Sequence, residues 1–409
     1  MAPARNLREA ADQLAEGPLP LNPARSGVVD QRISGDVMSS AESTSQGGTG
    51  GQPVDDAEVE RLRDRIIADA GGALAVPLAF LGDKLGLFAA LRSGGPATSA
   101  KLADRAGLAE RYVREWLLVM AASGYITYVG TTGDGSATSA MYQMSPEQVE
   151  IFVKTESPSY MAGAFQTFSS APRMLDRLAE AFRTGAGIGW HEHDDDTFVG
   201  TERFFRGAYQ ANLVSSWIPA LDGVEQKLIS GVRAADVGCG LGASTIILAK
   251  AYPATEWVGV DYHEPSVELA RSRAAEAGVG DRVTFQVASA SQLSGNYDFI
   301  TFFDCLHDMP DPVAALSAAR AALSPDGRVM VVEPKSSDAV VDQLTPLGRL
   351  MAGGSVFVCL PSGLSAPPAV GLGNQAGPSR TAEITAEAGF SRTRVATSNP
   401  FSMVYELRP

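Results

Sequence analysis

Cysteine is scarce in this sequence of 409 residues, and its scarcity excludes two classes of protein. The three cysteines, Cys239, Cys305 and Cys359, are widely spaced. A disulfide-stabilised secreted scaffold and a zinc knuckle both need more cysteines at closer spacing. We therefore expect neither, and we expect a reducing, cytoplasmic location in which free thiols persist.

Basic residues are also few, and this limits the partners that the surface can attract. Lys and Arg number 33 against 47 Asp and Glu, so the formal net charge is −14 and the isoelectric point is about 4.8. Such a surface repels phosphate backbones and anionic lipid headgroups. We expect neither nucleic acid nor a membrane as partner, since a long uninterrupted apolar run and the apolar core of a secretory signal are missing too.

Length and composition predict three regions. The chain is too long for one compact core, and its first part lacks an apolar period that could bury a face. We expect a disordered extension, then a helical domain, then an α/β domain. The extension contains a Ser-, Thr- and Gly-rich run at residues 43–51, for which binding of a partner is the alternative interpretation. The expected bounds are residues 1–56, 57–220 and 221–409.

The helical domain begins with a pattern that is typical of a winged helix: helix, turn, helix and hairpin. Apolar residues follow helical spacing from about Ala57, and a second apolar helix is expected at residues 74–91. Ser99 can cap a short helix that Gly107 ends. The remaining elements are a helix at residues 109–123 and alternating strands at residues 126–129 and 141–144.

Winged helices often bind DNA, so the charge of the second helix of the motif matters. Its exposed positions include Glu110, Arg111, Arg114 and Glu115, whose charges cancel. Such a helix offers no basic stripe to a phosphate backbone. We therefore expect this domain to serve dimerisation or to cover a substrate site, with DNA binding as the alternative.

A glycine-rich turn opens the α/β domain. Gly238, Gly240 and Gly242 follow a short strand at residues 232–237 and precede a helix. Glycines allow a tight turn and a close approach of ligand to backbone, and the helix N-terminus adds amide donors. The next strand ends at Asp261, where an acid can accept hydrogen bonds from both hydroxyls of an adenosine ribose. A nucleotide-type ligand is therefore expected, and these features alone also fit NAD.

Four histidines occur, and each lies in a motif. His307 follows a strand at residues 297–303, and ligands bind beyond the carboxyl ends of such strands. A His side chain titrates near neutral pH, so His307 can act as a general base. His191 and His193 lie in a loop that has three interpretations: a lid over a substrate, a structural loop, or a metal site. Because their alternation is not a strong ligand spacing, we predict no metal.

The first turn of the α/β domain resembles a known motif. Asp236 precedes Gly238, Gly240 and Gly242, so the turn reads Asp-Val-Gly-Cys-Gly-Leu-Gly. This is similar to motif I of class I S-adenosylmethionine methyltransferases, and much less similar to the dinucleotide fingerprint. In that family the acid lies near the methionyl amino end of the cofactor.

Further segments resemble two groups of methyltransferases. The winged-helix start, the His307-Asp308 pair and the Leu-Ser-Pro-Asp-Gly-Arg turn at residues 323–328 resemble small-molecule O-methyltransferases of the caffeate type. A group of actinobacterial winged-helix methyltransferases is more similar still, over about residues 57–409. The segments shared with that group are residues 190–193, 202–205, 261–264 and 303–309.

The resemblance implies a fold, a cofactor and a reaction. The fold class is α/β, a doubly wound Rossmann-like methyltransferase sheet with an N-terminal helical winged-helix domain. The cofactor is S-adenosylmethionine, with S-adenosylhomocysteine as product, and the acceptor is a small molecule of secondary metabolism, with O-methylation favoured. A homodimer through the N-terminal domain is expected. Two alternatives stay open: a non-methylating reaction such as cyclisation on the same fold, and an S-adenosylmethionine-binding regulator.

The resemblance also names site residues. His307 is the expected base, oriented by Asp308 or another acid. Ser289 stands where many methyltransferases have an Asp that holds adenine, and residues 351–379 are expected to cover the pocket. The expected cofactor contacts are Asp236, Gly238, Cys239, Gly240, Gly242, Asp261, Tyr262, Ser289 and Asp304. The expected substrate contacts are Phe165, Trp190, His191, His193, Phe204 and Tyr209, for which packing inside the helical domain is the alternative.

Overall fold

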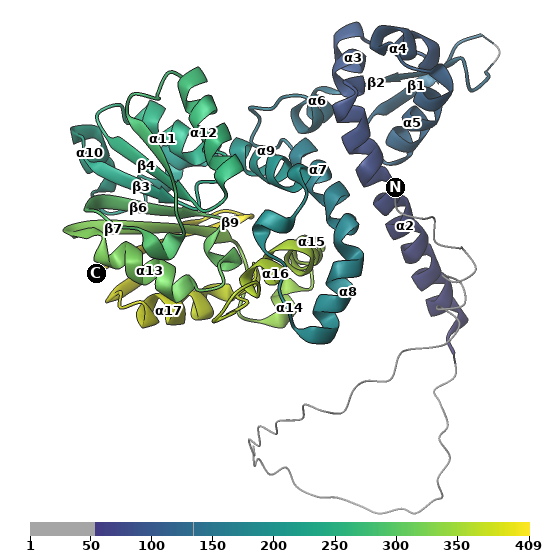
Figure 1. Ribbon diagram of the computed structural model, residues 1–409. Coiled ribbons are helices and arrows are strands. Elements are labelled where there is room, and N and C mark those ends of the chain that lie inside the picture. The colour runs from purple at the N-terminus through teal and green to yellow at the C-terminus, as the bar shows by residue number, and fades with distance from the viewer. Residues whose placement is uncertain (1–53, 134) are drawn as a thin grey trace, which may run out of the picture. The chain divides into compact units, whose positions relative to one another are not determined.

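The computed structural model describes residues 54–133 and 135–409 (Figure 1). Contacts divide the chain into two units, Met1–Val59 and Glu60–Pro409. Only residues 54–59 of the first unit are described, and most of them begin a helix. The disordered extension expected at residues 1–56 therefore lies almost wholly outside the described residues, and the expected domain bounds stay predictions.

Helix α2 (Asp56–Lys84) is one continuous helix where we expected two. Gly71 and Gly72 lie near its middle, but a glycine inside a helix costs only about 1 kcal/mol relative to alanine, so the helix continues. The break comes at Gly86, whose left-handed φ of 71° separates α2 from α3 (Leu87–Gly94). The prediction of a separate helix at residues 74–91 is therefore wrong.

Apolar side chains on α2 remain exposed. Leu62, Ile66, Ile67 and Leu74 each expose more than half of their surface, between 55% and 67%. Within the described residues, α2 is the one helix long and apolar enough to cross a bilayer by length and composition. A single helix of this kind is a weak indication of a span, because soluble proteins contain such helices too.

The winged helix has the predicted order of elements, but its cap differs. The side chain of Thr98, rather than Ser99, accepts a hydrogen bond from the Lys101 N–H at 3.4 Å. Ser99 is buried, and its hydroxyl donates to Glu110 instead. Gly107 ends the helix in the left-handed conformation, as expected. After α3 the elements are α4 (Ser99–Ala106), α5 (Glu110–Ala122), β1 (Thr127–Thr131) and β2 (Ala140–Gln143).

Helices fill the chain between the winged helix and the sheet. The longest of these, α9 (Asp195–Asn212), crosses α7 (Ala162–Ser170) so closely that a Cβ on Gly163 would lie 2.4 Å from the backbone N of Phe204. Glycine at this crossing therefore lets the two backbones touch. The other helices are α6 (Pro146–Phe152), η1 (Ala171–Met174), α8 (Leu175–Thr184), η2 (Trp190–Glu192), the π-helix η3 (Leu213–Trp217) and α10 (Val224–Ser230).

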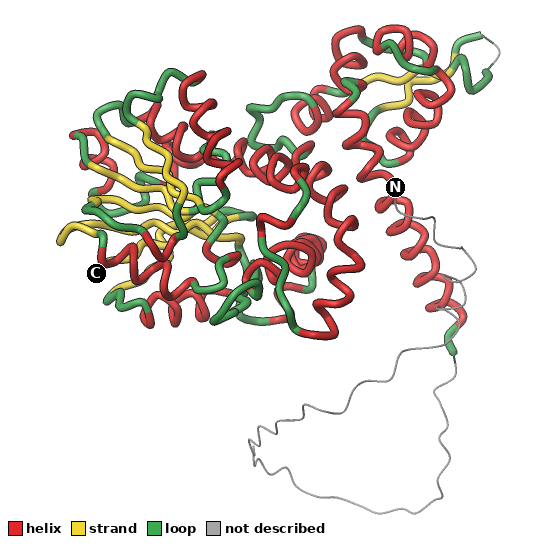
Figure 2. Tube along the Cα trace, viewed as in Figure 1, coloured by secondary structure: helices red, strands yellow, loops and turns green. Residues whose placement is uncertain are grey.

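The C-terminal part folds around a seven-stranded sheet with the order β5-β4-β3-β6-β7-β9-β8, which Figure 2 shows as a yellow layer. Neighbouring strands are parallel except at β9, which pairs antiparallel with β7 and with β8. This confirms the predicted α/β fold class. The strands are β3 (Arg233–Val237), β4 (Glu256–Asp261), β5 (Val283–Val287), β6 (Tyr297–Phe303), β7 (Leu323–Pro334), β8 (Arg392–Ser398) and β9 (Ser402–Arg408).

Helices cover both faces of this sheet (Figure 1). On one face, Leu248 of α11 (Ala243–Ala251) and Val267 of α12 (Glu264–Glu276) belong to one buried apolar cluster. On the other face, Leu316 of α13 (Pro312–Ala321) and Ile384 of α17 (Gly377–Glu387) belong to a second cluster. The sheet is thus buried on both sides, as its nearly continuous apolar strands require.

Two segments near β7 differ from expectation. Residues 323–328, expected as a turn, lie inside β7 as a large bulge, because Tyr297 pairs with Leu323 and Phe299 with Arg328. The segment between β7 and β8, which contains residues 351–379 and is called the insertion below, begins with helices, although its composition is rich in Gly and Pro. Its elements are α14 (Val340–Gln343), α15 (Pro346–Gly354), the π-helix η6 (Ser355–Cys359) and α16 (Leu360–Gly363).

Candidate functional site

A cavity of about 620 Å³ opens at the carboxyl ends of β3, β4 and β6. Residues that directly follow these strands line one side, and α9 with the loop before it lines another. The insertion contributes Ser362, Ser365, Ala366 and Pro367 to the lining. Its contact with the loop includes a 2.9 Å hydrogen bond from Ile188 N–H to the Pro361 carbonyl. Open α/β sheets bind ligands at this edge, so the cavity is the candidate site.

The glycine turn lies on the cavity wall as predicted. Gly238 has a φ of 70°, and a Cβ there would lie 2.7 Å from the Cys305 sulfur. Gly240 has a φ of 50°, and a Cβ there would point into open space. Gly242 lies behind the wall, where it packs against Phe285 and Ala270. Gly238, Gly240 and Cys239 therefore leave room beside the backbone for a ligand.

Asp261 faces the same wall at the end of β4. Its Oδ2 accepts a 2.9 Å hydrogen bond from Gly240 N–H, and its Oδ1 accepts one of 2.9 Å from His263 N–H. Burial raises the pKa of Asp261, and the two backbone donors oppose that rise. A carboxylate has about four acceptor sites, so each oxygen retains one for a ligand hydroxyl. Asp261 is thus fixed in place and able to bind a diol.

Tyr262 and His191 close one side of the cavity above this acid. The Tyr262 hydroxyl accepts a 3.2 Å hydrogen bond from the His191 backbone N–H, and the two rings meet edge to face. Both residues line the cavity, as does Ser289 with its neighbours from Ala288 to Ser291. Burial raises the pKa of Tyr262 to about 12, so its hydroxyl stays protonated. The predicted contacts Tyr262, His191 and Ser289 therefore lie together.

Asp236 lies elsewhere than expected. It is fully buried beneath the glycine turn and does not line the cavity. Ser244 and Thr245 donate to its Oδ2 at 2.7 and 2.6 Å, and Thr301 donates to its Oδ1 at 3.0 Å. Burial raises its pKa to about 6, against the lowering effect of these hydroxyls. Asp236 therefore ties the turn, α11 and β6 together.

Asp304 follows β6 with a φ of 48°, a rare conformation for a residue other than glycine. Its Oδ2 accepts a 2.7 Å hydrogen bond from the Tyr209 hydroxyl. Its Oδ1 is buried and has no hydrogen-bond partner among the described residues. Burial raises the pKa of Asp304 to about 7. Strain and an unsatisfied acceptor at one cavity residue are typical of a functional position.

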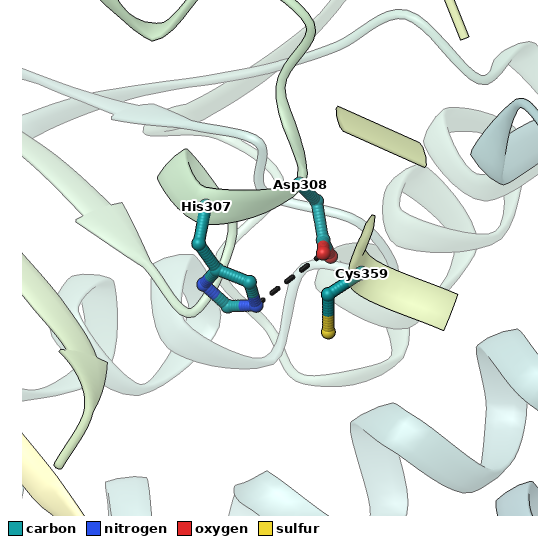
Figure 3. Close-up of side chains that lie close together, drawn as sticks. All are labelled: His307, Asp308 and Cys359. Carbon is teal, nitrogen blue, oxygen red and sulfur yellow. Dashed lines mark ion pairs between the residues drawn. The ribbon is translucent and has the colours of Figure 1, made fainter. Parts of the chain in front are cut away.

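His307 is buried between the carboxylates of Asp308 and Glu333. Figure 3 shows His307 with the first of these, Asp308. Its Nδ1 pairs with Glu333 Oε2, and its Nε2 lies 3.3 Å from Asp308 Oδ1. Burial alone would lower the pKa of His307, but the two carboxylates raise it well above its usual range. Asp308 lines the cavity and His307 does not. The acid that orients the imidazole is therefore Glu333, and Asp308 lies on the cavity side.

Glu333 is a site residue that the sequence reasoning missed. It is the last residue but one of β7, the strand beside β6, and its Oε1 accepts a 3.1 Å hydrogen bond from Leu306 N–H. The signal was present, because neighbouring parallel strands end at the same edge and bring their terminal acids together. An acid at the end of β7 thus lies within reach of any side chain that follows β6.

The expected substrate residues divide into two groups. Trp190, His191 and Tyr209 line the cavity. Phe165 packs against Tyr125 and Phe152 with the winged-helix core, at ring distances of 5.5 and 5.7 Å, so its assignment to the substrate was wrong. Phe204 and His193 lie outside the lining, and His193 is buried beside Trp190.

The charge of the lining selects among ligands. It contains six carboxyl groups and, among the described residues, neither Lys nor Arg. Dinucleotides carry an anionic pyrophosphate, which such a wall repels. A sulfonium ion with an ammonium group carries positive charge, which the same wall attracts. The residues present therefore fit S-adenosylmethionine and disfavour NAD. The six are Glu192, Glu202, Asp261, Asp304, Asp308 and Asp311.

Comparison with known proteins agrees with this geometry. The 27-O-demethylrifamycin SV methyltransferase of Amycolatopsis mediterranei is 32% identical over 131 residues, which are 30% of this chain and 48% of that protein. The chain spans less than half of the length of the first curated relatives that it matches.

Solved structures extend the likeness to nearly the whole fold. Human N-acetylserotonin methyltransferase in complex with SAM has a TM-score of 0.65 at 18% sequence identity. The match covers 88% of this chain and 99% of the human chain. A mitomycin 7-O-methyltransferase has a TM-score of 0.63 at 19% identity, with 87% and 100% covered. At such identities the likeness concerns the fold.

Two family models match separate parts of the chain. Residues 72–153 match the Rv2258c-like winged HTH domain, and residues 228–359 match the methyltransferase domain. Together with the fold, these matches confirm the resemblance drawn from the motifs. The chain therefore joins an Rv2258c-like winged HTH domain to a methyltransferase domain.

Proposed function

We propose that this protein is an S-adenosylmethionine-dependent methyltransferase that acts on a small-molecule acceptor, with oxygen as the favoured nucleophile. The observation that carries the proposal is the cavity itself, in which a glycine turn and Asp261 meet a lining rich in carboxylates and free of Lys and Arg among the described residues. The matched methyltransferase domain supports it. The rifamycin and mitomycin acceptors in the names of similar proteins support a natural-product substrate.

The cofactor supplies a methyl group on a sulfonium, which is already a good leaving group. The chain has to bind this molecule, exclude water and align an acceptor with the methyl carbon. Asp261 binds the ribose hydroxyls through the acceptor sites that Gly240 and His263 leave free. Gly238 and Gly240 would border the methionyl part of the cofactor, and residues 288–291 would border its adenine, because both segments line the cavity.

The acceptor lies against the apolar part of the same cavity. Trp190, Phe198, Phe205 and Phe303 line it, and the roof from the insertion keeps water out. Asp308 presents a carboxylate to the cavity and takes the hydrogen bond of an acceptor hydroxyl. His307 lies behind Asp308, with Glu333 on its far nitrogen, and stabilises the charge as the proton moves.

The winged helix is proposed to serve dimerisation. The exposed apolar side chains of α2, Leu62, Ile66, Ile67 and Leu74, support a homodimer, because neighbouring exposed apolar residues are typical of a protein contact site. DNA binding finds no support, since Arg111 pairs with Glu115 and Arg114 with Glu110 along α5. The cytoplasmic location and the role in secondary metabolism stay predictions.

A methyl-transfer assay tests the proposal. The full chain is incubated with methyl-labelled S-adenosylmethionine and a panel of phenols and alcohols, and products are analysed by mass spectrometry. We expect S-adenosylhomocysteine and a labelled product in equal amounts. A product formed without S-adenosylhomocysteine, or cofactor rearranged without an acceptor, would replace methyl transfer by the non-methylating alternative.

A further inference from the structure

We propose that His307, Asp308 and Cys359 form a binding site for one first-row divalent cation, with zinc the best match to these ligands. The site shares His307 and Asp308 with the proposed acceptor site, but it is defined by three side chains and can be tested without a substrate. Figure 3 shows the three side chains converging on a common space.

The three ligand atoms are close enough for one ion. The imidazole nitrogen, the carboxylate oxygen and the Cys359 sulfur all lie within 4.8 Å of one another. His307 Nε2 and Asp308 Oδ1 are 3.3 Å apart. A tetrahedral ion bound at about 2.0–2.3 Å separates its ligand atoms by roughly 3.3–3.6 Å. Small side-chain movements would therefore complete the ligand set.

Oδ1 of Asp308 is a buried acceptor without a hydrogen-bond donor among the described residues, although Nε2 of His307 is near. A buried acceptor without a donor is costly. The two atoms are 3.3 Å apart, yet they do not form a hydrogen bond. A cation bound to both atoms would satisfy them.

Glu333 prepares His307 for this role. Histidines that bind a metal with one nitrogen usually donate the N–H of the other to a carboxylate, which fixes the ring and raises its basicity. Glu333 pairs with Nδ1, and Leu306 N–H in turn holds Glu333 at 3.1 Å. Nε2 is therefore directed at Asp308 and Cys359 with little freedom to turn.

Cys359 is brought to the site by an unusual backbone. It ends the π-helix η6, which interrupts the path from α15 to α16. π-helical turns are rare and are concentrated at functional positions. The thiol is free and buried, 51 residues after Asp308 in sequence. The π-helix therefore ends with its last side chain beside a His and an Asp.

The ligand chemistry selects the ion. A thiolate, an imidazole and a carboxylate together favour zinc or another first-row divalent metal over magnesium and calcium, which prefer oxygen alone. Three protein ligands leave a fourth position open. Since Asp308 lines the cavity, that position faces the candidate acceptor site. An ion there would take Nε2 of His307 away from proton transfer.

Metal binding is tested on the full chain after removal of metal with a chelator. The protein is dialysed against zinc or cobalt, its metal content is measured, and the absorption of the cobalt form is recorded. We expect one ion per chain and a thiolate-to-cobalt charge-transfer band. Cys359→Ser should abolish the band, and Glu333→Gln should weaken binding roughly ten- to a hundredfold.

Cys305→Ser is the matched control, because the Cys305 sulfur contacts the Val237 carbonyl and lies outside the cluster. It should keep both the ion and the band. Absence of metal in the wild type, or a band that survives Cys359→Ser, would overturn the site, the latter as an adventitious ion only. Thermal unfolding checks that each variant folds. Titration of S-adenosylmethionine into metal-free protein tests the cofactor site separately.

Discussion

The hydroxyl of Tyr209 donates a 2.7 Å hydrogen bond to Asp304 Oδ2, while Oδ1 of the same carboxylate is buried without a donor. Among the described residues, one tyrosine from α9 therefore donates the side-chain hydrogen bond that this acid accepts. Because α9 and β6 lie far apart in sequence, the pair also links the helical part to the sheet.

Tyr209→Phe should destabilise the protein by about 1–3 kcal/mol, because it leaves a buried carboxyl group without its donor. Urea unfolding at neutral pH measures the change. Tyr252→Phe is the control, since the Tyr252 hydroxyl is buried and has no hydrogen-bond partner among the described residues. Its removal should change stability by less than about 0.5 kcal/mol. Equal losses in both variants would contradict the role of the Tyr209–Asp304 bond.

Asp261→Asn should weaken S-adenosylmethionine binding by about 1.5–3 kcal/mol, or roughly ten- to a hundredfold, because an amide has one acceptor oxygen where the carboxylate has two. Calorimetric titration with S-adenosylmethionine and S-adenosylhomocysteine measures both affinities. Asp281→Asn removes a carboxylate that is 75% exposed and far from the lining, so it should bind as the wild type does. Unchanged affinity in Asp261→Asn would remove the ribose assignment.

The stability of the protein should fall as the pH falls below about 6.5, in part because of His193. Burial lowers the pKa of His193 to about 4, so the folded protein keeps this ring neutral while the unfolded chain takes up a proton at its ordinary value. The unfolded state therefore binds more protons between about pH 6.5 and 4, and stability is lost through that window. The full effect is at most about 3 kcal/mol.

Unfolding of His193→Asn at pH 7.5 and at pH 5 measures this contribution. The variant should lose less stability on acidification than the wild type does. His191→Asn is the control, because it makes the same substitution at an exposed residue two positions earlier in the chain. An identical pH dependence in wild type and His193→Asn would mean that other groups account for the acid sensitivity.

Arg203 should be among the most sensitive residues of α9. Its guanidinium contacts Asp83 at 2.8 Å, Gln166 at 2.7 Å and the Tyr160 hydroxyl, and its side chain is only 19% exposed. Arg203→Met leaves a mostly buried carboxylate unpaired, so a loss of about 2–4 kcal/mol is expected. Arg183→Met breaks an exposed pair with Glu180 and should cost less than about 0.5 kcal/mol.

Chemical unfolding of the two variants gives the comparison. Arg203→Lys keeps the charge but loses the planar fork, so it should lie between Met and wild type. A neutral Arg203→Met would show that the network is not a structural requirement of the helix crossing.

The strands of the sheet were predictable because buried parallel strands are short apolar runs bounded by turns. The bounds of β6 agree with the predicted ones to the residue. Helix α2 was not predictable in the same way, since Gly71 and Gly72 suggest a break that the helix tolerates and only Gly86 ends it. Local sequence does not say which glycine adopts a left-handed φ.

The site was predictable where one segment carries it. The glycine turn and Asp261 lie where the motif places them. The orientation of aromatic residues was not predictable, because the sequence does not say that Phe165 packs against the winged-helix core while Trp190 lines the cavity. Glu333 lies beside His307 because β7 is the neighbour of β6, and Cys359 lies there because of the path of the chain after β7. Neither the strand order nor that path can be predicted from one segment of sequence.

The π-helix η6 carries one more residue per hydrogen-bonded turn than an α-helix. Each residue of an α-helix rotates the chain by about 100° around the helix axis. Deleting one residue within η6 would thus restore ordinary winding and rotate everything after it by about a quarter turn. Cys359 would swing away from His307, and Pro361 would lose its bond with Ile188. A single-residue deletion would therefore separate the cavity residues of the α16 segment from those that follow the strands of the sheet.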